Sequence, residues 1–252
     1  MFIDSHAHLG DDALFLQLEA VKKRAKEALV DCIIDICTDS KTLQRGLSLQ
    51  EGVPHIFLAA ATTPHDVEKE GVSFFPEVEK AALEGNLIAI GETGLDYYYE
   101  HSPKEVQKTF LLQYVRLAIR TKLPLIFHCR EAFGDLFSLV RAEYQGKALV
   151  HCFTGTLEEA RQALDLGWYI SLSGIITFKK SEALREVARY IPLDRILIET
   201  DAPYLAPQSK RGQTNESSFI QETARVLAEV KGVSIEELAK RTTENARVFF
   251  SL

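Results

Sequence analysis

The sequence predicts an α/β fold, a TIM-type (β/α)8 barrel, and three observations lead to it. Short apolar runs alternate with helix-like stretches along the chain, which is the pattern of repeated strand and helix units. The apolar runs are mostly continuous in Ile, Val, Leu and Phe, as in parallel strands that are covered on both faces. The chain has 252 residues, and one such barrel occupies about 250 residues. We therefore expect a single domain over residues 1–252, with a closed barrel favoured over an open doubly wound sheet.

Eight candidate strands follow one another along the chain. They are FIDSH at 2–6, CIIDIC at 32–37, IFLAAA at 56–61, LIAIGE at 87–92, PLIFHC at 124–129, ALVHC at 148–152, WYISLS at 168–173 and RILIET at 195–200. Amphipathic segments predict helices at 12–29, 103–121, 132–142, 156–166 and 181–190. Ser102-Pro103 is a start signal for the second of these helices, and Gly146 and Gly167 are stop signals for the two that follow. Residues 216–250 are predicted to be helices that complete the outer ring.

The composition is that of an ordinary globular protein, with 46% apolar and 26% charged residues. The first residues, MFIDSHAHLG, lack the basic and apolar regions of a signal peptide. No apolar run approaches the roughly 18 residues that span a bilayer, so we expect a cytoplasmic monomer without a membrane partner. The four cysteines, Cys32, Cys37, Cys129 and Cys152, form no CxxC pair and are expected to be reduced and buried.

The net charge of the chain bears on how strongly it can bind a polyanion such as DNA. Acidic residues number 36 and basic residues 29, for a formal charge of -7, which disfavours tight non-specific binding to DNA. A nucleic-acid substrate is still compatible with this charge, because metal ions and a few basic side chains in a cleft can hold one phosphate.

His6 and His8 flank Ala7 at the end of the first predicted strand. Side chains two residues apart on a strand point the same way, so the two imidazoles can clamp one metal ion. The motif is weak on its own, because polar surface loops also produce HxH by chance.

Four more side chains of metal-ligand type lie at or just past the ends of other predicted strands. They are Glu92, His128, His151 and Asp201. In a barrel, active sites are assembled at the carboxyl ends of the strands, so these four are predicted to converge with the first two histidines on one metal site. The alternative is that His128 and His151 are only hydrogen-bonded barrel histidines. Strand alternation turns the thiols of Cys129 and Cys152 toward the helices, so neither is expected to be a ligand.

Longer motifs are far more specific than HxH. In chain order they are MFIDSHAHLG, IGETGLDYYY with SPKEVQ after it, LPLIFHCREA, HCFTG, ILIETDAPYLAP, RGQTNE and TTENARVFF. In order and spacing they resemble the TatD family of metal-dependent deoxyribonucleases, and the likeness covers nearly the whole chain. The resemblance implies a barrel of the metallo-dependent hydrolase type with a two-metal centre, acting on single-stranded DNA from its 3′ end.

The resemblance also implies a role for each ligand. His6, His8 and Asp201 would hold one metal, His128 and His151 the other, and Glu92 would bridge them. Two divalent ions about 4 Å apart can share a water and lower its pKa, and a carboxylate suits a bridge because it has two oxygens. Asp201 is also the candidate general base, and the metals can be Zn, Mn or Mg.

Four side chains are candidates for contact with the substrate. Arg130 lies two residues beyond His128 and can grip a phosphate with its guanidinium, although a surface ion pair is equally expected. Arg211 belongs to the RGQTNE stretch. Where TatD-like chains carry a GxHPH-like stretch, this chain has Thr63 in the place of a histidine that relatives direct at the phosphate, and His65 is a candidate substitute.

Other side chains near the site have supporting or ambiguous roles. Glu199 and Asp4 lie two residues before ligands on their strands and are expected to face inward behind them. The run Tyr97 to Tyr99 can stack on a base, but a structural role for the whole run is at least as well supported.

Four other functions compete with a nuclease. A PHP-type phosphoesterase commonly needs three metals and more histidines, whereas only seven occur here and ETDAP contains none. An amidohydrolase often bridges its metals with a strand lysine, but Lys122 precedes its strand. Within the TatD family, ester hydrolysis on D-aminoacyl-tRNA stays open, and an inactive barrel that only binds a partner is the alternative from another class.

Overall fold

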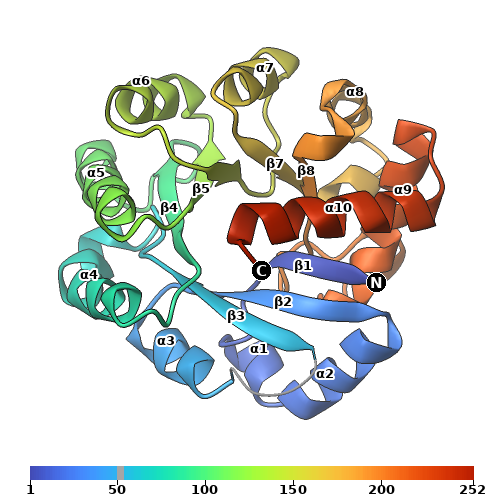
Figure 1. Ribbon diagram of the computed structural model, residues 1–252, viewed down its shortest axis with the longest axis horizontal. Coiled ribbons are helices and arrows are strands. Elements are labelled where there is room, and N and C mark those ends of the chain that lie inside the picture. Colours follow the sequence, from blue (N-terminus) through green and yellow to red (C-terminus); the bar gives the residue numbers. More distant parts are fainter. Residues whose placement is uncertain (50–53) are drawn as a thin grey trace.

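Eight parallel strands pair in chain order from β1 to β8 and surround a central axis (Figure 1). The computed structural model describes residues 1–49 and 54–252. The strands are β1 (Phe2–Ala7), β2 (Val30–Cys37), β3 (His55–Ala60), β4 (Ala89–Asp96), β5 (Leu125–Arg130), β6 (Ala148–Val150), β7 (Tyr169–Leu172) and β8 (Ile196–Ile198). The predicted TIM-type barrel is confirmed, and each predicted strand overlaps an observed one.

Helices connect the strands and lie outside them (Figure 1). They are α1 (Asp12–Phe15), α2 (Leu18–Glu27), α3 (Ser40–Leu47), α4 (Val67–Leu83), α5 (Lys104–Thr121), α6 (Phe133–Glu143), α7 (Leu157–Asp165), α8 (Glu182–Tyr190), α9 (Ile220–Lys231) and α10 (Ile235–Phe250). The single helix predicted at 12–29 is two helices, because the backbone leaves the helix between Phe15 and Leu18. Within the described ranges, no helix combines the length and the apolar character that a membrane span requires.

The ring is completed where the end of β1 meets the segment after β8. Ala7 and Ala202 form a parallel bridge, and the amide of Asp201 donates to the carbonyl of His6 at 2.9 Å. Asp4 reinforces this seam, because its carboxylate accepts from the amide of Thr200 at 2.9 Å and from its hydroxyl at 2.6 Å. Asp4 therefore joins the first and last strands instead of lying behind His6.

The last helix does not complete the outer ring as the sequence predicts. α9 packs against α8 in that ring, whereas α10 crosses the amino end of the barrel (Figure 1). Its apolar face, with Ala246, Phe249 and Phe250, packs on an interior cluster to which every strand contributes a side chain. Packing this face on the barrel interior removes its apolar surface from water. The amino end is thereby closed and the carboxyl end is left open.

Strand β4 runs to Asp96, four residues farther than predicted. Gly94 makes this extension possible, because a Cβ at this position would lie 1.9 Å from the carbonyl oxygen of His128. Glycine thus lets β4 and β5 approach closely. As a result Glu92 lies within its strand and not at its end.

Candidate metal centre

The predicted ligands come together around a cavity of about 410 Å³ at the carboxyl end of the barrel. His8, Glu92, His128, His151 and Asp201 line its wall, and His6 is fully buried beneath them. They come from β1, β4 and β5 and from the residues that follow β1, β6 and β8. The convergence that the sequence predicts is therefore present.

Glu92 contacts two histidines, one in β1 and one directly after β6. One of its oxygens, Oε2, is 3.1 Å from His6 Nε2 and 2.8 Å from His151 Nε2. The rings of His6 and His151 stack with centroids 3.9 Å apart and an interplanar angle of 7°. A single carboxylate oxygen thus faces both halves of the site.

Asp201 stands on the side of the first two histidines. Its Oδ1 is 3.4 Å from His8 Nε2 and 3.6 Å from His6 Nε2. The residue has a φ of 59°, a left-handed conformation that is uncommon for side chains other than glycine and often marks a functional site.

Among the described residues, two of the four groups of possible ligand atoms share one carboxylate. His6, His8 and Glu92 have ligand atoms within 4.8 Å of one another, and so do Glu92, His128 and His151. Glu92 is common to both groups, which is what a bridging ligand requires. The assignment of each side chain to a particular ion stays a prediction.

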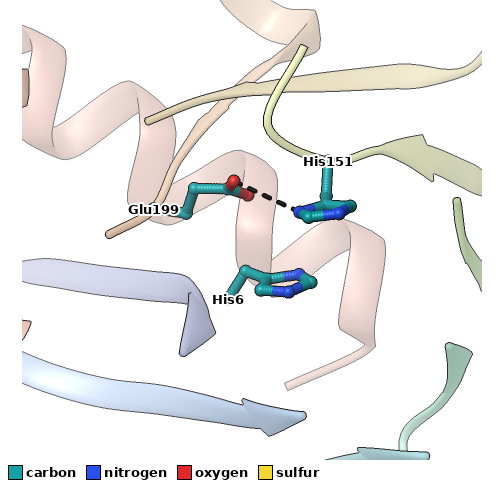
Figure 2. A group of neighbouring side chains, drawn as sticks. All are labelled: His6, His151 and Glu199. Carbon is teal, nitrogen blue, oxygen red and sulfur yellow. Dashed lines mark ion pairs between the residues drawn. The ribbon is translucent and has the colours of Figure 1, made fainter. Parts of the chain in front are cut away.

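Side chains behind the histidines fix their ring orientation. Figure 2 shows Glu199 pointing at His151, with Oε1 at 3.4 Å from Nδ1, and the hydroxyl of Ser171 donates to the other oxygen of Glu199. His8 Nδ1 lies 3.2 Å from the carbonyl of Ile36. Partners of this kind set which ring nitrogen is free to bind a metal, so Glu199 has the place that the sequence predicts for it.

Several buried polar atoms of the centre have no aligned hydrogen-bond partner among the described residues, although some lie at ion-pair distance from one another. They are His6 Nδ1 and Nε2, Glu92 Oε2, His151 Nδ1 and Glu199 Oε1. Leaving such atoms unpaired costs free energy. Imidazole and carboxylate donors suit divalent ions such as Zn²⁺ and Mn²⁺, so the donor set fits a metal centre.

The imidazoles and carboxylates of the site shift one another's pKa values, and not all in the direction that favours a metal ligand. Burial lowers the pKa of His6, and His151 beside it adds to the effect. Burial also acts to lower the pKa of His8, but Asp201 outweighs it and raises the pKa to about 9. Burial acts to lower the pKa of His151, but Glu92 and Glu199 outweigh it and raise that pKa well above its usual value. This ring, like that of His8, must therefore lose a proton to bind a cation. Burial acts to raise the pKa of Glu92, yet His151 and His6 hold it well below its usual range. Glu92 is therefore a carboxylate beside the unprotonated ring of His6, and both can bind a cation.

Arg130 reaches the cavity wall from the end of β5. Its guanidinium lies 4.0 Å from the ring centroid of Tyr98 and 5.0 Å from that of Tyr99, and it forms no ion pair within the described ranges. The tyrosine run is thereby divided, because the hydroxyl of Tyr97 donates to Asp135 at 2.7 Å instead. Arg130 is a cation without a carboxylate partner, held by two aromatic rings.

The other predicted substrate contacts differ in position. Thr63 and His65 line the cavity, with the Thr63 hydroxyl donating to Asp66 at 3.2 Å. Arg211 is not among the residues that line the cavity. Its guanidinium lies 4.7 Å from the ring of Phe178 on an exposed loop. The structure thus brings two of these three to the centre.

The prediction for one cysteine is wrong. The four cysteines are free, and Cys129 is buried in the core as expected, although the residue also borders the cavity. Cys152, however, lies on the cavity wall with its sulfur 3.1 Å from the hydroxyl of Ser173. Strand alternation does not apply there, because β6 ends at Val150 and Cys152 has a φ of 44°.

Asp96 belongs to the site, but the sequence interpretation does not include it. Its Oδ2 lies 2.9 Å from His128 Nε2 and 3.6 Å from His65 Nε2. A signal was present in the sequence, because Asp96 is four residues after Glu92 and alternation along a longer strand gives both the same face.

Comparisons with known proteins agree with this geometry. The model of the family described as TatD related DNase matches residues 3–251. The uncharacterized metal-dependent hydrolase YcfH of Escherichia coli (strain K12) is 43% identical over 262 residues, which cover 98% of this chain and 95% of the relative. The corresponding hydrolase YabD of Bacillus subtilis is 36% identical over 255 residues, and the whole of both chains is covered.

Two further proteins extend the comparison. The 3'-5' ssDNA/RNA exonuclease TatD of Pantoea vagans is 33% identical over 243 residues, with 93% of each chain covered. The crystal structure of YjjV, a TatD homologue from Escherichia coli K12, superposes with a TM-score of 0.93 at 29% identity, covering 100% of this chain and 98% of that one. The resemblance found in the motifs is thereby confirmed.

Proposed function

The chain belongs to the TatD family of metal-dependent hydrolases, and from this premise we propose that it is a two-metal phosphodiesterase that removes nucleotides from the 3′ end of single-stranded DNA. The observation that carries the proposal is the place of Glu92, whose Oε2 lies 3.1 Å from His6 Nε2 and 2.8 Å from His151 Nε2. A carboxylate in contact with imidazoles of both predicted ligand sets can bridge two metal ions, and a pair of ions about 4 Å apart is suited to phosphoryl chemistry. The name of the Pantoea vagans relative supports the substrate and the direction.

The residues of the centre fit two divalent ions, Zn, Mn or Mg. His6, His8 and Asp201 would hold one, His128 and His151 the other, and Glu92 both. Such ions would lower the pKa of an attacking water and offset the charge of the scissile phosphate.

The chain's own side chains perform the remaining steps. Asp201 accepts the proton of the attacking water. Burial acts to raise its pKa, but His8 and His6 keep that pKa below the usual value, so the group is an ionised carboxylate with a free lone pair for the proton. Arg130 holds a phosphate oxygen. Its contacts with Tyr98 and Tyr99 already restrict the side chain, so less conformational entropy is lost when it binds the phosphate.

The cavity also supports a terminal nucleotide as the occupant. A volume of about 410 Å³ lies within the usual range for small-molecule sites, which suits a single nucleotide. The formal charge of -7 weakens attraction to the rest of a strand, so recognition depends on the last nucleotide and its phosphate. His65 and the hydroxyl of Thr63 lie on the same wall and can contact that phosphate.

The test uses single-stranded oligonucleotides of one sequence with the 3′ end, the 5′ end or neither end blocked. Each is incubated with Zn²⁺, Mn²⁺, Mg²⁺ or EDTA. We expect a ladder from the free and the 5′-blocked strands with at least one metal, and none from the 3′-blocked strand or in EDTA. Equal degradation of the 3′-blocked strand would overturn the direction. A metal-loaded chain that leaves all three strands intact but releases the amino acid from D-aminoacyl-tRNA would overturn the phosphodiesterase assignment.

A further inference from the structure

Asp96, at the end of β4, holds two different parts of the site at once. Its Oδ2 lies 2.9 Å from His128 Nε2. Its Oδ1 accepts from the amides of Tyr98 at 3.0 Å and Tyr99 at 2.8 Å. The Asp96 amide in turn donates to the side-chain carbonyl of Gln107 at 2.8 Å. The Asp96 side chain is 1% exposed. One carboxylate oxygen therefore faces the histidine, and the other is fixed by two backbone amides.

The ring of His128 has a different neighbour at each nitrogen. Nε2 faces the Asp96 carboxylate, and Nδ1 lies 3.4 Å from His151 Nε2, on the side of Glu92. A neutral imidazole carries its proton on one nitrogen and a lone pair on the other, and an ionised carboxylate can only accept. In the neutral ring this contact favours the proton on Nε2, which leaves the lone pair at Nδ1 on the side of Glu92 and His151.

We propose that Asp96 is the positioning residue of the centre, which fixes the tautomer and orientation of His128 for metal binding and holds the turn whose tyrosines flank Arg130. The proposal rests on the proposed metal centre. The Asp96 carboxylate would then connect the ion-binding half of the site with the phosphate-binding half. Partners of this kind are typically worth about 10- to 100-fold in metal affinity or activity.

The variant Asp96→Asn separates the effect on the ring from an effect on the fold. The amide carbonyl still accepts from Tyr98 and Tyr99, so the turn is kept. The amide nitrogen then faces His128 Nε2, which must accept a hydrogen bond and move its proton to Nδ1. A proton on Nδ1 occupies the lone pair that would otherwise bind the metal.

Two measurements without substrate test this step. Nitrogen-15 NMR of the metal-free protein, with the ring of His128 assigned by its loss in His128→Gln, reports which nitrogen carries the proton. We expect Nε2–H in the wild type and Nδ1–H in Asp96→Asn. Titration with Mn²⁺ and with Zn²⁺ against a competing chelator should show one of two bound ions weakened by about 10- to 100-fold in the variant, with the other unchanged.

Asp135→Asn is the matched control. Asp135 accepts from the hydroxyl of Tyr97 at 2.7 Å and pairs with Lys108 at 3.0 Å, so it supports the same turn without contact with a histidine. The control should keep both the tautomer and the metal affinity of the wild type.

Several results would overturn the proposal. Equal metal affinity in the wild type and Asp96→Asn would do so, as would an equal loss in Asp135→Asn. If Asp96→Asn fails to fold, the wild type alone decides, because a proton on Nδ1 of His128 contradicts the proposed tautomer. Absence of nuclease activity in a metal-loaded wild type would overturn the proposed function and leave this inference standing.

Discussion

The side chain of Asn215 brackets Asp201, because its amide nitrogen donates to the carbonyl of Thr200 at 2.7 Å and to that of Tyr204 at 2.6 Å. Asn215 is fully buried and lies in the RGQTNE stretch. In the sequence analysis, Arg211 is the residue of this stretch that receives a candidate role. The two bonds span the turn in which Asp201 takes its left-handed conformation. The stretch therefore supports the metal centre through this asparagine.

Asn215→Ala should lower both stability and metal binding. It leaves two buried carbonyls unpaired, which costs about 1–3 kcal/mol for each group, and it frees the turn that presents Asp201. The matched control is Asn245→Ala, because Asn245 donates to the carbonyls of Leu193 at 2.7 Å and Ile196 at 2.8 Å at the closed end of the barrel. Urea unfolding should show similar losses for both variants, and metal titration a loss only for Asn215→Ala. Equal metal binding in the two would contradict the role of the turn.

Glu92→Ala should abolish turnover and release bound metal, because it removes a ligand from both predicted ions at once. Metal content after dialysis and hydrolysis of a labelled oligonucleotide are the measurements. Glu237→Ala, which removes an exposed carboxylate of α10 that pairs with Arg241, is the control and should match the wild type. Two retained ions together with wild-type hydrolysis in Glu92→Ala would contradict the bridging assignment.

Asp201→Asn should separate metal binding from the reaction. The amide oxygen still coordinates a cation, but the side chain cannot accept a proton, so the rate should fall by about 10²- to 10⁴-fold while much of the metal stays bound. Metal content and single-turnover hydrolysis, measured on one preparation, check this. Full activity would remove the role of Asp201 as base.

The threonine at position 63 should limit the rate. A hydroxyl gives a neutral hydrogen bond and carries no positive charge, and Thr63 donates to Asp66 here. Losing one donor to a transition-state phosphate costs on the order of 100-fold, so Thr63→His is expected to raise kcat and His65→Ala to lower it. His55→Ala, at the exposed start of β3, is the control. No gain from the first and no loss from the second would mean that this wall takes no part in phosphate recognition.

The strands and the convergence of the ligand-type side chains could be predicted because each depends on short-range information. Apolar runs mark the strands, and ligand-type side chains at their ends mark the site. The end of β4 was not predictable in this way, because Gly94 and Asp96 are poor strand formers and only the close approach of β5 explains them. The extra length of β4 is also what places Asp96 beside His128.

Other features depend on partners far away in the sequence. Asp96 and His128 are 32 residues apart. The two carbonyls that Asn215 binds are brought together by a turn whose conformation cannot be predicted from the local sequence. The amphipathic pattern of α10 shows that one face is buried but not which surface covers it. These positions are set by tertiary packing, which local patterns do not encode.

Helix α10, which crosses the amino end of the barrel, closes that end. Beneath Glu92, side chains from all eight strands and the two phenylalanines of α10 fill the interior, so the described part of the chain offers no passage through the barrel. For the exonuclease function proposed above, this means that a released nucleotide and the next nucleotide of the strand would share the opening at the carboxyl end. Product release would then have to precede entry of the next nucleotide.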